Sequence, residues 1–342
     1  MKINKQNSDD IILMAHGGGG VLTKKLIDEL IVRELGNPIL NQLDDGACLT
    51  MPESEIVMTT DSYVVDPVFF PGGDIGTLAV CGTVNDLAMQ GAEPKYMSMS
   101  LIIEEGFFIR DLKRIILSIS DTVKKVNVLI VTGDIKVVER SAKKGLFINT
   151  TGIGKRLPEV DVSVSNALPG DAVIITGTLG DHGIAIMNQR EGLQLESGLL
   201  SDVAPLWSLI KPVLNDIPNI HCLRDPTRGG IASALCDIAN ASSCGIQIQE
   251  TALPIKEEVT GACDILGLDP LNVANEGKAV IVCSNNDSAQ VIKILKNNPL
   301  GKNASVIGKV VKEHSGIVSL ETKAGGKRIV DMPTGESLPR IC

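Results

Sequence analysis

Aspartates at the ends of predicted elements are the side chains of this sequence best suited to bind a metal. They stand in four segments, "LDDGA" (Asp44, Asp45), "TTDS" (Asp61), "TVNDLA" (Asp86) and "VTGD" (Asp134). Oxygen ligands at several loop ends are what Mg²⁺ requires, and Mg²⁺ binds together with substrate phosphates rather than in an all-protein cage. A single Asp at such a junction is more often a cap or a turn residue. The four segments therefore indicate a metal site, with a set of structural caps as the alternative.

A strip of glycines offers a place for a phosphate. The segment "HGGGG" ends with Gly17, Gly18, Gly19 and Gly20 and stands directly before the amphipathic pattern of residues 21–36. Exposed backbone N–H groups at a helix start bind phosphate with help from the helix dipole. The spacing matches neither a P-loop nor a dinucleotide fingerprint, so a flexible turn remains the alternative.

Three further segments carry side chains that could bind an anion or move a proton. "RDPTRGG" presents Arg224 and Arg228 at a predicted helix start, where they favour either an anionic ligand or structural salt bridges. "VANEGK" places Glu276 and Lys278 at a loop-to-strand junction, which suits a catalytic position or a plain turn. Lys136 in "GDIK" could stabilise phosphate charge or transfer a proton, or could simply be exposed.

The last residue given, Cys342, stands in a segment without apolar periodicity. Residues 323–342, "KAGGKRIVDMPTGESLPRIC", are rich in glycine and proline, which predicts a mobile tail with a thiol at its tip. At ~3.3 Å per residue, residues 335–342 would extend roughly 25 Å. The other seven cysteines include no C-x-x-C pair, so we expect most of them to be small core residues.

Strands and helices alternate around these segments. The first half predicts strands at 54–62, 95–103 and 145–154, a helix at 72–92, and a helix followed by a strand within 109–134. The second half predicts mixed elements within 171–187, a helix at 225–242, and strands at 245–250 and 277–284. Turn residues gather at 155–170, where we place the domain boundary. The fold class is therefore α/β or mixed α+β.

Composition narrows the function. At 342 residues, two domains are favoured, and with 44% apolar but only 2% aromatic residues the core must be aliphatic sheet covered by helices. The net charge of −9 and the scarcity of aromatic side chains argue against nucleic-acid binding. The chain has neither a secretory signal nor the ~18 consecutive apolar residues that span a membrane, so a cytoplasmic protein is expected.

Taken in order, the motifs "TTDS", "VNDLAMQGA", "VTGDIKVVE", "RDPTRGG", "VANEGK" and "PRIC" resemble those of the AIR synthetase-like (PurM-like) superfamily of ATP-using enzymes. Within it, the chain resembles the HypE-type carbamoyl dehydratases of hydrogenase maturation, from about residue 10 to the end. The most specific motif is "PRIC", supported by "HGGGG" and "GDIKVVE". The aspartate motifs alone indicate only the superfamily.

This resemblance implies an activity and a set of partners. A HypF-type carbamoyltransferase would carbamoylate Cys342, and ATP with Mg²⁺ would drive dehydration of the thiocarbamate to a thiocyanate. The cyano group would pass to iron on a HypC–HypD complex as a cyanide ligand of the [NiFe]-hydrogenase centre. Cys342 would thus be both nucleophile and carrier.

The resemblance also implies roles for single residues. The catalytic residues would be Cys342, Lys136 and Glu276. The cofactor-binding residues would be Gly17, Gly18, Gly19, Gly20, Asp44, Asp61, Asn85, Gly133 and Asp134. The metal ligands would be Asp45, Asp61, Asp86 and Asp134. One departure is Ile135, where a small polar residue such as Thr is expected in many relatives, which weakens a nucleotide role for that side chain.

The implied architecture has two domains and a homodimer formed through the first. We expect a glycine-rich segment and helix at 1–40, an ATP- and Mg-binding dimerisation domain at 41–160, a C-terminal α/β domain at 161–324, and a mobile tail at 325–342. The nucleotide would lie near the dimer interface.

Two other functions remain open. A selenophosphate synthetase or thiamine-monophosphate kinase would share the aspartates but need no thiol in the tail. Selenophosphate synthetases are expected to carry a reactive Cys or selenocysteine near the N-terminus, whereas the first cysteine here is Cys48. A scaffold whose tail docks on a partner would keep partner binding without binding ATP.

Overall fold

The first half of the chain is built on a four-stranded sheet. The structure is a computed structural model, and it describes residues 11–17, 21–42, 49, 55–140, 145–192 and 198–333. The strands lie in the order β1-β6-β4-β5, with bounds β1 (Ile56–Tyr63), β4 (Ala92–Glu104), β5 (Leu129–Val138) and β6 (Leu146–Arg156). β4 and β5 are parallel, and the other neighbours are antiparallel. The four strands expected in this half are confirmed.

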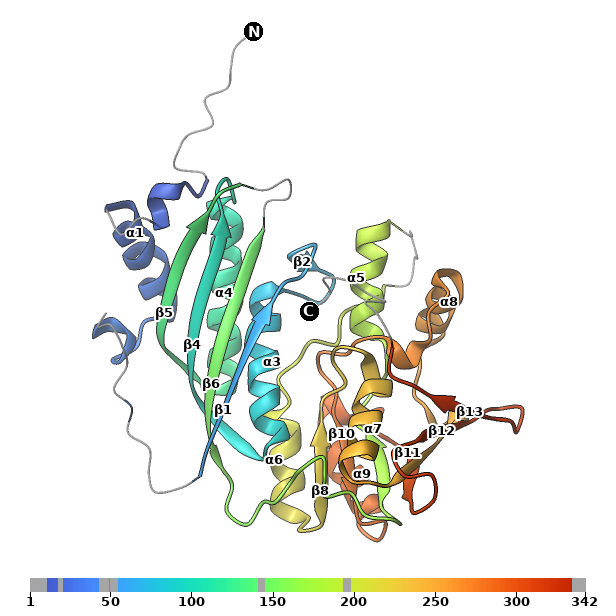
Figure 1. The fold of residues 1–342 in the computed structure, drawn as a ribbon. Helices are drawn as coiled ribbons and strands as arrows, with labels where there is room; N and C mark the ends of the chain where they lie inside the picture. Colours follow the sequence, from blue (N-terminus) through green and yellow to red (C-terminus); the bar gives the residue numbers. More distant parts are fainter. Residues whose placement is uncertain are drawn as a thin grey trace.

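Two helices cover one face of this sheet (Figure 1). They are α3 (Ile75–Met89) and α4 (Ile109–Val126). Asp74 caps α3 by accepting the N–H groups of Gly76 and Thr77 at 2.9 and 3.0 Å. Before α3, the short strands β2 (Phe69–Phe70) and β3 (Gly73–Asp74) form a hairpin. Because α3 is rich in small residues and buried along most of its length, it can pack closely on the sheet.

A helical stretch lies beside β5 at the edge of the sheet (Figure 1). It consists of η2 (Met14–Gly17), α1 (Val21–Leu26), η3 (Ile27–Val32), α2 (Arg33–Leu35) and η4 (Leu40–Gln42). The Asn37 side chain donates to the carbonyl of Ile130 in β5 at 2.7 Å. The Ser120 hydroxyl in α4 donates to the carbonyl of Glu34 at 2.7 Å. These bonds tie the helix expected at 21–36 to both neighbouring elements.

The second half contains a seven-stranded sheet in the order β13-β12-β9-β11-β7-β10-β8. Its strands are β7 (Ala172–Ile175), β8 (Ile220–Arg224), β9 (Gly245–Gln249), β10 (Val280–Cys283), β11 (Ser305–Val311), β12 (Val318–Glu321) and β13 (Lys327–Val330). Only β12 and β9 pair in parallel. Every residue of β7 and β10 is buried, as their uniformly apolar sequences predict.

Helices flank this sheet. They are α5 (Asp181–Glu191), α6 (Trp207–Asp216), α7 (Gly230–Ala241), α8 (Glu257–Leu266) and α9 (Ser288–Lys296), with the short turns η5 (Glu250–Ala252), η6 (Pro270–Asn272) and η7 (Pro299–Gly301). The mixed α/β class expected from the sequence is confirmed.

The start of the expected tail needs correction. We expect a mobile tail from residue 325, but residues 327–330 form β13, which pairs antiparallel with β12. Val330 at its end is 3% exposed and packs in the core of this half. The second sheet therefore continues to Val330, because main-chain pairing and one buried side chain hold a segment with no apolar periodicity.

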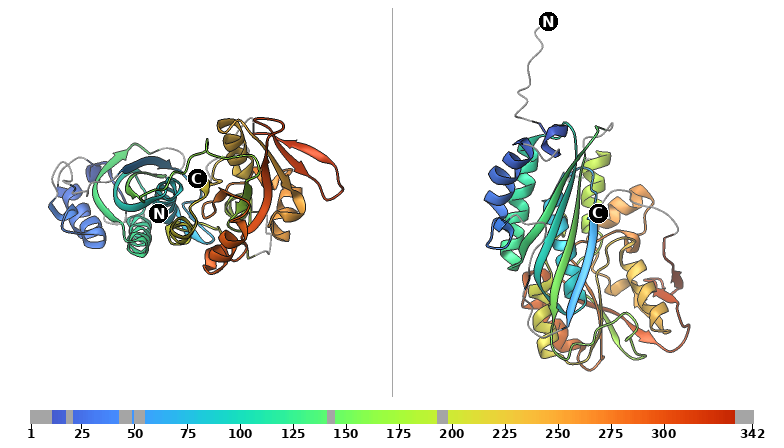
Figure 2. Two further views of the ribbon diagram at one scale, coloured as in Figure 1. Left: turned by 90° about the horizontal axis from the view of Figure 1, so that it is seen from below. Right: turned by 60° about the vertical axis from the view of Figure 1, so that its left-hand side comes forward.

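The two halves lie side by side (Figure 2), and one apolar core runs through both. It joins Val84 and Ala88 of α3 to Leu206, Ile210 and other residues of the second half. The six cysteines that the structure describes are free and buried, which confirms the expectation of small core residues for these six. Among the described residues, no helix combines the length and apolarity that crossing a membrane requires. The shared core fixes the two halves relative to each other at the boundary where the site lies.

Candidate active site

A cavity of about 240 Å³ between the two halves gathers charged side chains. They come from β1, α3, the segment 224–230 before α7, and the segment 275–278 before β10. The lining residues are Asp61, Ser62, Tyr63, Gly82, Asp86, Arg224, Asp225, Thr227, Arg228 and Glu276. The structure thus brings together four motifs that the sequence singled out separately.

Hydrogen bonds hold two aspartates at this cavity. The Tyr63 hydroxyl donates to Oδ2 of Asp61 at 3.2 Å, and the Thr59 hydroxyl donates to Oδ2 of Asp86 at 2.7 Å. Arg228 Nη2 lies 3.9 Å from Oδ1 of Asp61. In each of these two carboxylates, the hydroxyl that positions it therefore bonds to one oxygen and leaves the other oxygen without a hydroxyl donor.

Crowding of carboxylates changes their acidity. Burial, together with the nearby Asp225 and Asp61, raises the pKa of Asp86 to about 7, against the hydrogen bond from Thr59, which lowers it. Burial also raises the pKa of Asp225, which Arg224 and Arg228 partly oppose. A cavity that disfavours several negative charges in this way is stabilised by a cation.

The donor set fits Mg²⁺ brought by a nucleotide. Within the described ranges, no three His, Cys, Asp or Glu side chains are arranged as a preformed metal cluster. Mg²⁺ is usually held by one or two carboxylates together with substrate phosphates and water. Asp61 and Asp86 line one cavity and meet that requirement.

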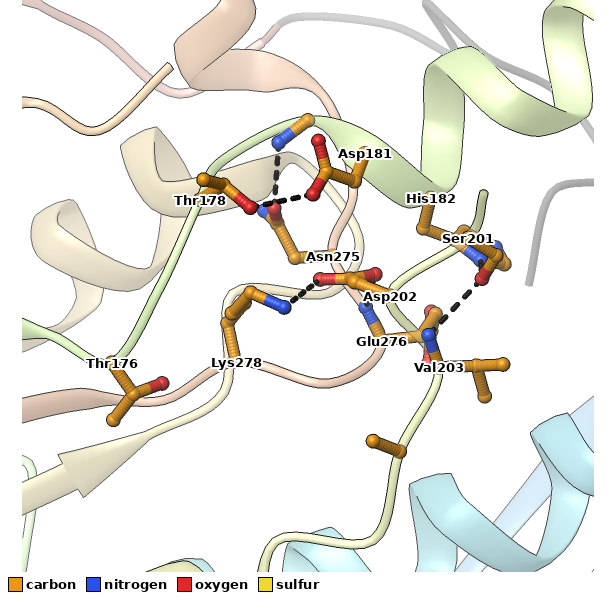
Figure 3. A network of polar contacts seen from close by, with 12 residues as sticks. Thr176, Thr178, Asp181, His182, Ser201, Asp202, Val203, Asn275, Glu276 and Lys278 are labelled. Carbon is orange, nitrogen blue, oxygen red and sulfur yellow. Dashed lines mark hydrogen bonds and ion pairs between the residues drawn. The ribbon is translucent and has the colours of Figure 1, made fainter. Parts of the chain in front are cut away.

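Glu276 and Lys278 have different surroundings (Figure 3). Glu276 lines the cavity and is 3% exposed. Lys278 Nζ instead pairs with Oδ2 of Asp202 at 3.0 Å, and both of these side chains are buried. The motif "VANEGK" offered two candidates for a catalytic residue, and only Glu276 lines the cavity.

Asn85 makes contacts other than those expected for cofactor binding. Its side chain is 2% exposed. Nδ2 donates to the carbonyls of Ala204 and Glu276 at 3.1 and 3.2 Å, and Oδ1 accepts from the N–H of Leu206 at 2.7 Å. Because both amide hydrogens and the amide oxygen are engaged by main chain, the Asn85 amide is not available to a nucleotide in this arrangement.

Asp134 and Lys136 lie elsewhere on the first sheet. In register across the strands, Asp134 pairs with Ser100, Ser100 with Asn149, and Asn149 with Ser62. Paired residues share a face and neighbours along a strand alternate, so Asp134 lies on the face opposite to Asp61. Lys136, two residues on, shares the face of Asp134, and both are exposed. One chain therefore does not bring these two residues to the acidic cavity.

Asp134 instead lines a second cavity, of about 400 Å³, between β5 and the helical stretch at its edge. Its walls are mainly apolar and include Ile27, Ile31, Leu40, Met99, Gly133 and Ile135. Ile135, the departure from the family pattern, also packs against the main core. Gly17 closes η2, which contacts β5. Three residues expected to bind ATP, Gly17, Gly133 and Asp134, are thus associated with this edge of the sheet.

The remaining expected site residues, Gly18, Gly19, Gly20, Asp44, Asp45 and Cys342, lie outside the described residues. The last described residue, Pro333, lies close to the cavity segment 224–230. A Cβ atom built on Gly229 would stand 3.3 Å from Cγ of Pro333. The chain therefore leaves the second sheet beside the loop that carries Arg224 and Arg228.

Among the lining residues that the sequence does not single out, Asp225 and Tyr63 carry ionisable side chains. Asp225 stands within "RDPTRGG" between the arginines, and that motif was the available signal. Tyr63 follows "TTDS" by one residue, but a Tyr at a strand end is ordinarily a core residue. Only the fold shows that its hydroxyl reaches Asp61.

Two family models match the chain. "AIR synthase related protein, N-terminal domain" matches residues 43–155, and "AIR synthase related protein, C-terminal domain" matches residues 169–321. With the two-sheet fold and the acidic cavity between the halves, these matches define an AIR synthase related protein.

Individual relatives are more specific. A carbamoyl dehydratase HypE of Azotobacter vinelandii is 46% identical over 329 residues, covering 96% of each chain. A crystal structure of the hydrogenase maturation protein HypE in complex with ATP superposes with a TM-score of 0.93 at 44% identity, covering 96% of this chain and 99% of the other. A crystal structure of a HypE–HypF complex matches with a TM-score of 0.79 at 46% identity, covering 90% and 99%. The chain belongs to the HypE family of carbamoyl dehydratases.

Proposed function

We propose that this protein uses ATP to dehydrate a carbamoyl group carried on Cys342, giving a thiocyanate that supplies the cyanide ligands of the [NiFe]-hydrogenase iron. The observation that carries the proposal is the cavity between the halves, where aspartates, arginines and Glu276 meet beside the segment that leads to Cys342. Relatives covering nearly the whole chain are named for this activity.

The overall reaction is R–S–C(O)NH₂ + ATP → R–S–C≡N + ADP + phosphate. The carbamoyl oxygen attacks the γ-phosphorus, and the bond from that phosphorus to ADP breaks. The carbon–oxygen bond then breaks and releases phosphate, while the nitrogen loses its two protons, one to a base of the chain and one to the released phosphate. Phosphorylation is needed because hydroxide is a poor leaving group from this carbon.

The chain contributes charge and a base to this chemistry. Arg224 and Arg228 stabilise negative charge on the transferred phosphoryl group, where catalysis depends mainly on position and electrostatics. Asp61 and Asp86 would hold Mg²⁺, which would offset further charge on the phosphoryl group. Glu276, a buried carboxylate that lines this cavity, accepts a proton from the carbamoyl nitrogen.

We place the nucleoside of ATP in the second cavity, beside Asp134. Its apolar walls suit a flat base. Asp134 and Asp61 are three strands apart, roughly 14 Å, and on opposite faces of the sheet. We propose that a second copy of the chain completes the site for one ATP molecule.

A homodimer supplies that second copy. The face of the first sheet away from α3 and α4 exposes Ile56, Met58 and Ile102, which are 57%, 68% and 42% exposed. A two-fold dimer would cover this surface and bring the face of Asp134 and Lys136 against the partner. Lys136 would then act on the partner's site.

We propose a HypF-type carbamoyltransferase as donor and a HypC–HypD complex as acceptor, in the cytoplasm. A related HypE has been crystallised with HypF, which supports the first of these partners. The acceptor rests on the family resemblance.

Intact-mass analysis of the peptide that contains Cys342 tests the proposal. The chain is carbamoylated by a HypF-type transferase, freed of transferase and nucleotide, and then given Mg-ATP or a non-hydrolysable analogue. We expect the carbamoyl adduct to lose one water with ATP alone, and Cys342→Ala to carry no adduct. An unmodified peptide, with ATP consumed only when another small acceptor is added, would contradict the proposal and favour a small-molecule kinase.

A further inference from the structure

We infer that Asp202 and Asn85 are positioning residues that hold Glu276 in the cavity by its main chain. This inference rests on the proposed function, because it takes Glu276 as the base. Oδ1 of Asp202 accepts the N–H of Glu276 at 3.0 Å, and Nδ2 of Asn85 donates to the Glu276 carbonyl at 3.2 Å. Both main-chain polar groups of Glu276 are therefore fixed by side chains from other parts of the chain.

The Asp202 carboxylate is fully committed to this loop (Figure 3). While Oδ1 binds Glu276, Oδ2 pairs with Lys278 Nζ at 3.0 Å, and the two side chains of that pair are only 3% and 9% exposed. Removing one partner of a buried ion pair leaves the other charge without compensation, which is costly. One carboxylate thus fixes the positions on both sides of Gly277.

Close packing leaves the loop little freedom to move. A Cβ atom built on Gly277 would stand 1.8 Å from the Asp202 carbonyl oxygen, so the two backbones lie in direct contact. On the other side, the N–H of Ser201 donates to the carbonyl of Pro71 at 2.8 Å. The segment around Asp202 therefore packs between the β2–β3 hairpin and the loop that carries Glu276.

Asn85 ties the same loop to the helix that carries Asp86. The two residues are adjacent in α3, with Asn85 directed at the main chain of the second half and Asp86 at the cavity. Any shift of Glu276 away from Asp86 must break the bond from Asn85. The two hydrogen bonds to the main chain of Glu276, from Asp202 and Asn85, together set the distance between this base and the aspartates of the cavity.

Position of this kind affects rate more than binding. A misplacement of about 1 Å at a reacting group can cost about 100-fold in rate. Neither Asp202 nor Asn85 lines the cavity. Their loss should therefore lower the rate of dehydration with little change in the KM for ATP.

Asp202→Asn tests the inference, because an amide has one acceptor oxygen and cannot serve both Glu276 and Lys278. We expect dehydration of carbamoylated protein to slow by about 10- to 100-fold, with the KM for ATP changed by less than about threefold. Gly277→Ala, which pushes the two backbones apart without changing a polar group, should act in the same direction.

Asp171→Asn is the matched control. Asp171 is also buried, accepts the N–H of Leu168 at 2.7 Å and contacts His221 at 2.7 Å, but it lies at the other end of β7 from the Glu276 loop. We expect it to lower the melting temperature as much as Asp202→Asn does and to leave the rate of dehydration unchanged.

A double-mutant cycle separates this inference from the function it rests on. If Asp202 acts through Glu276, Asp202→Asn should cost nothing further in a Glu276→Gln background. Full activity of Glu276→Gln alone would refute the role of Glu276 itself. A slow Glu276→Gln with a fully active Asp202→Asn, or additive losses in the double variant, would overturn the positioning role.

Discussion

At the scale of single residues, the acidic cavity is an arrangement that a bound cation stabilises. Burial and the neighbouring carboxylates raise the pKa of Asp86 to about 7, so near neutral pH its ionisation works against the ligand-free fold. A group whose folded pKa is raised contributes stability at low pH and loses it as pH rises toward that pKa. The ligand-free protein should therefore lose stability as pH rises toward 7, because of Asp86.

Asp86→Asn exposes that signature. Without nucleotide or Mg²⁺, the unfolding free energy of the variant minus that of the wild type should increase by about 1–3 kcal/mol from pH 5 to pH 8. Urea unfolding at the two pH values measures the gain. The exposed Asp121→Asn serves as control, and a difference from wild type that is equal at both pH values would contradict the account.

At the scale of elements, local patterns predicted most of the first half, because its strands and α4 show clear periodicity. β13 could not be predicted, since the four residues "KRIV" are held by pairing with β12 rather than by a local pattern. The sequence also could not predict that Asp61 and Asp134 lie on opposite faces of the first sheet. Both stand at predicted strand positions, but which face each occupies depends on the register of four strands.

The nucleoside cavity is a property of β5 and the helical stretch beside it. Ile31→Trp would fill part of the cavity, so we expect the dissociation constant for Mg-ATP to rise about tenfold or more, as titration calorimetry would measure. Leu117→Trp places the same side chain at a partly exposed position of α4, away from both cavities, and should leave ATP affinity unchanged. Equal affinities for the two variants would move the nucleoside out of this cavity.

At the scale of the whole molecule, the sequence and the resemblance led to two domains, ATP and a homodimer. They did not show that the cavity joins Asp86 of α3 to Asp225 and Glu276 of the second half, because such contacts arise only when the halves share a core. Asp202 lies in a segment with no motif at all. Residues that position others through the main chain leave little local signal.

The dimer proposal makes a prediction for assembly and for activity. Met58→Asp puts a charge on the open face of the first sheet, and sedimentation should then show a monomer. Leu168→Asp, also at an exposed apolar position, should stay dimeric.

Mixed dimers test where Lys136 acts. One chain carries Lys136→Ala and the other Glu276→Gln, and we expect about half of the wild-type activity per dimer, because one intact site forms across the interface. Inactive mixed dimers would place Lys136 in the site of its own chain.

The central claim is that phosphorylation removes the carbamoyl oxygen, and the fate of that oxygen tests it most directly. Cys342 is loaded with a carbamoyl group labelled with ¹⁸O and given unlabelled Mg-ATP in unlabelled water. The account predicts that the label appears in inorganic phosphate, one atom for each thiocyanate formed. Label recovered in water, with unlabelled phosphate, would contradict it.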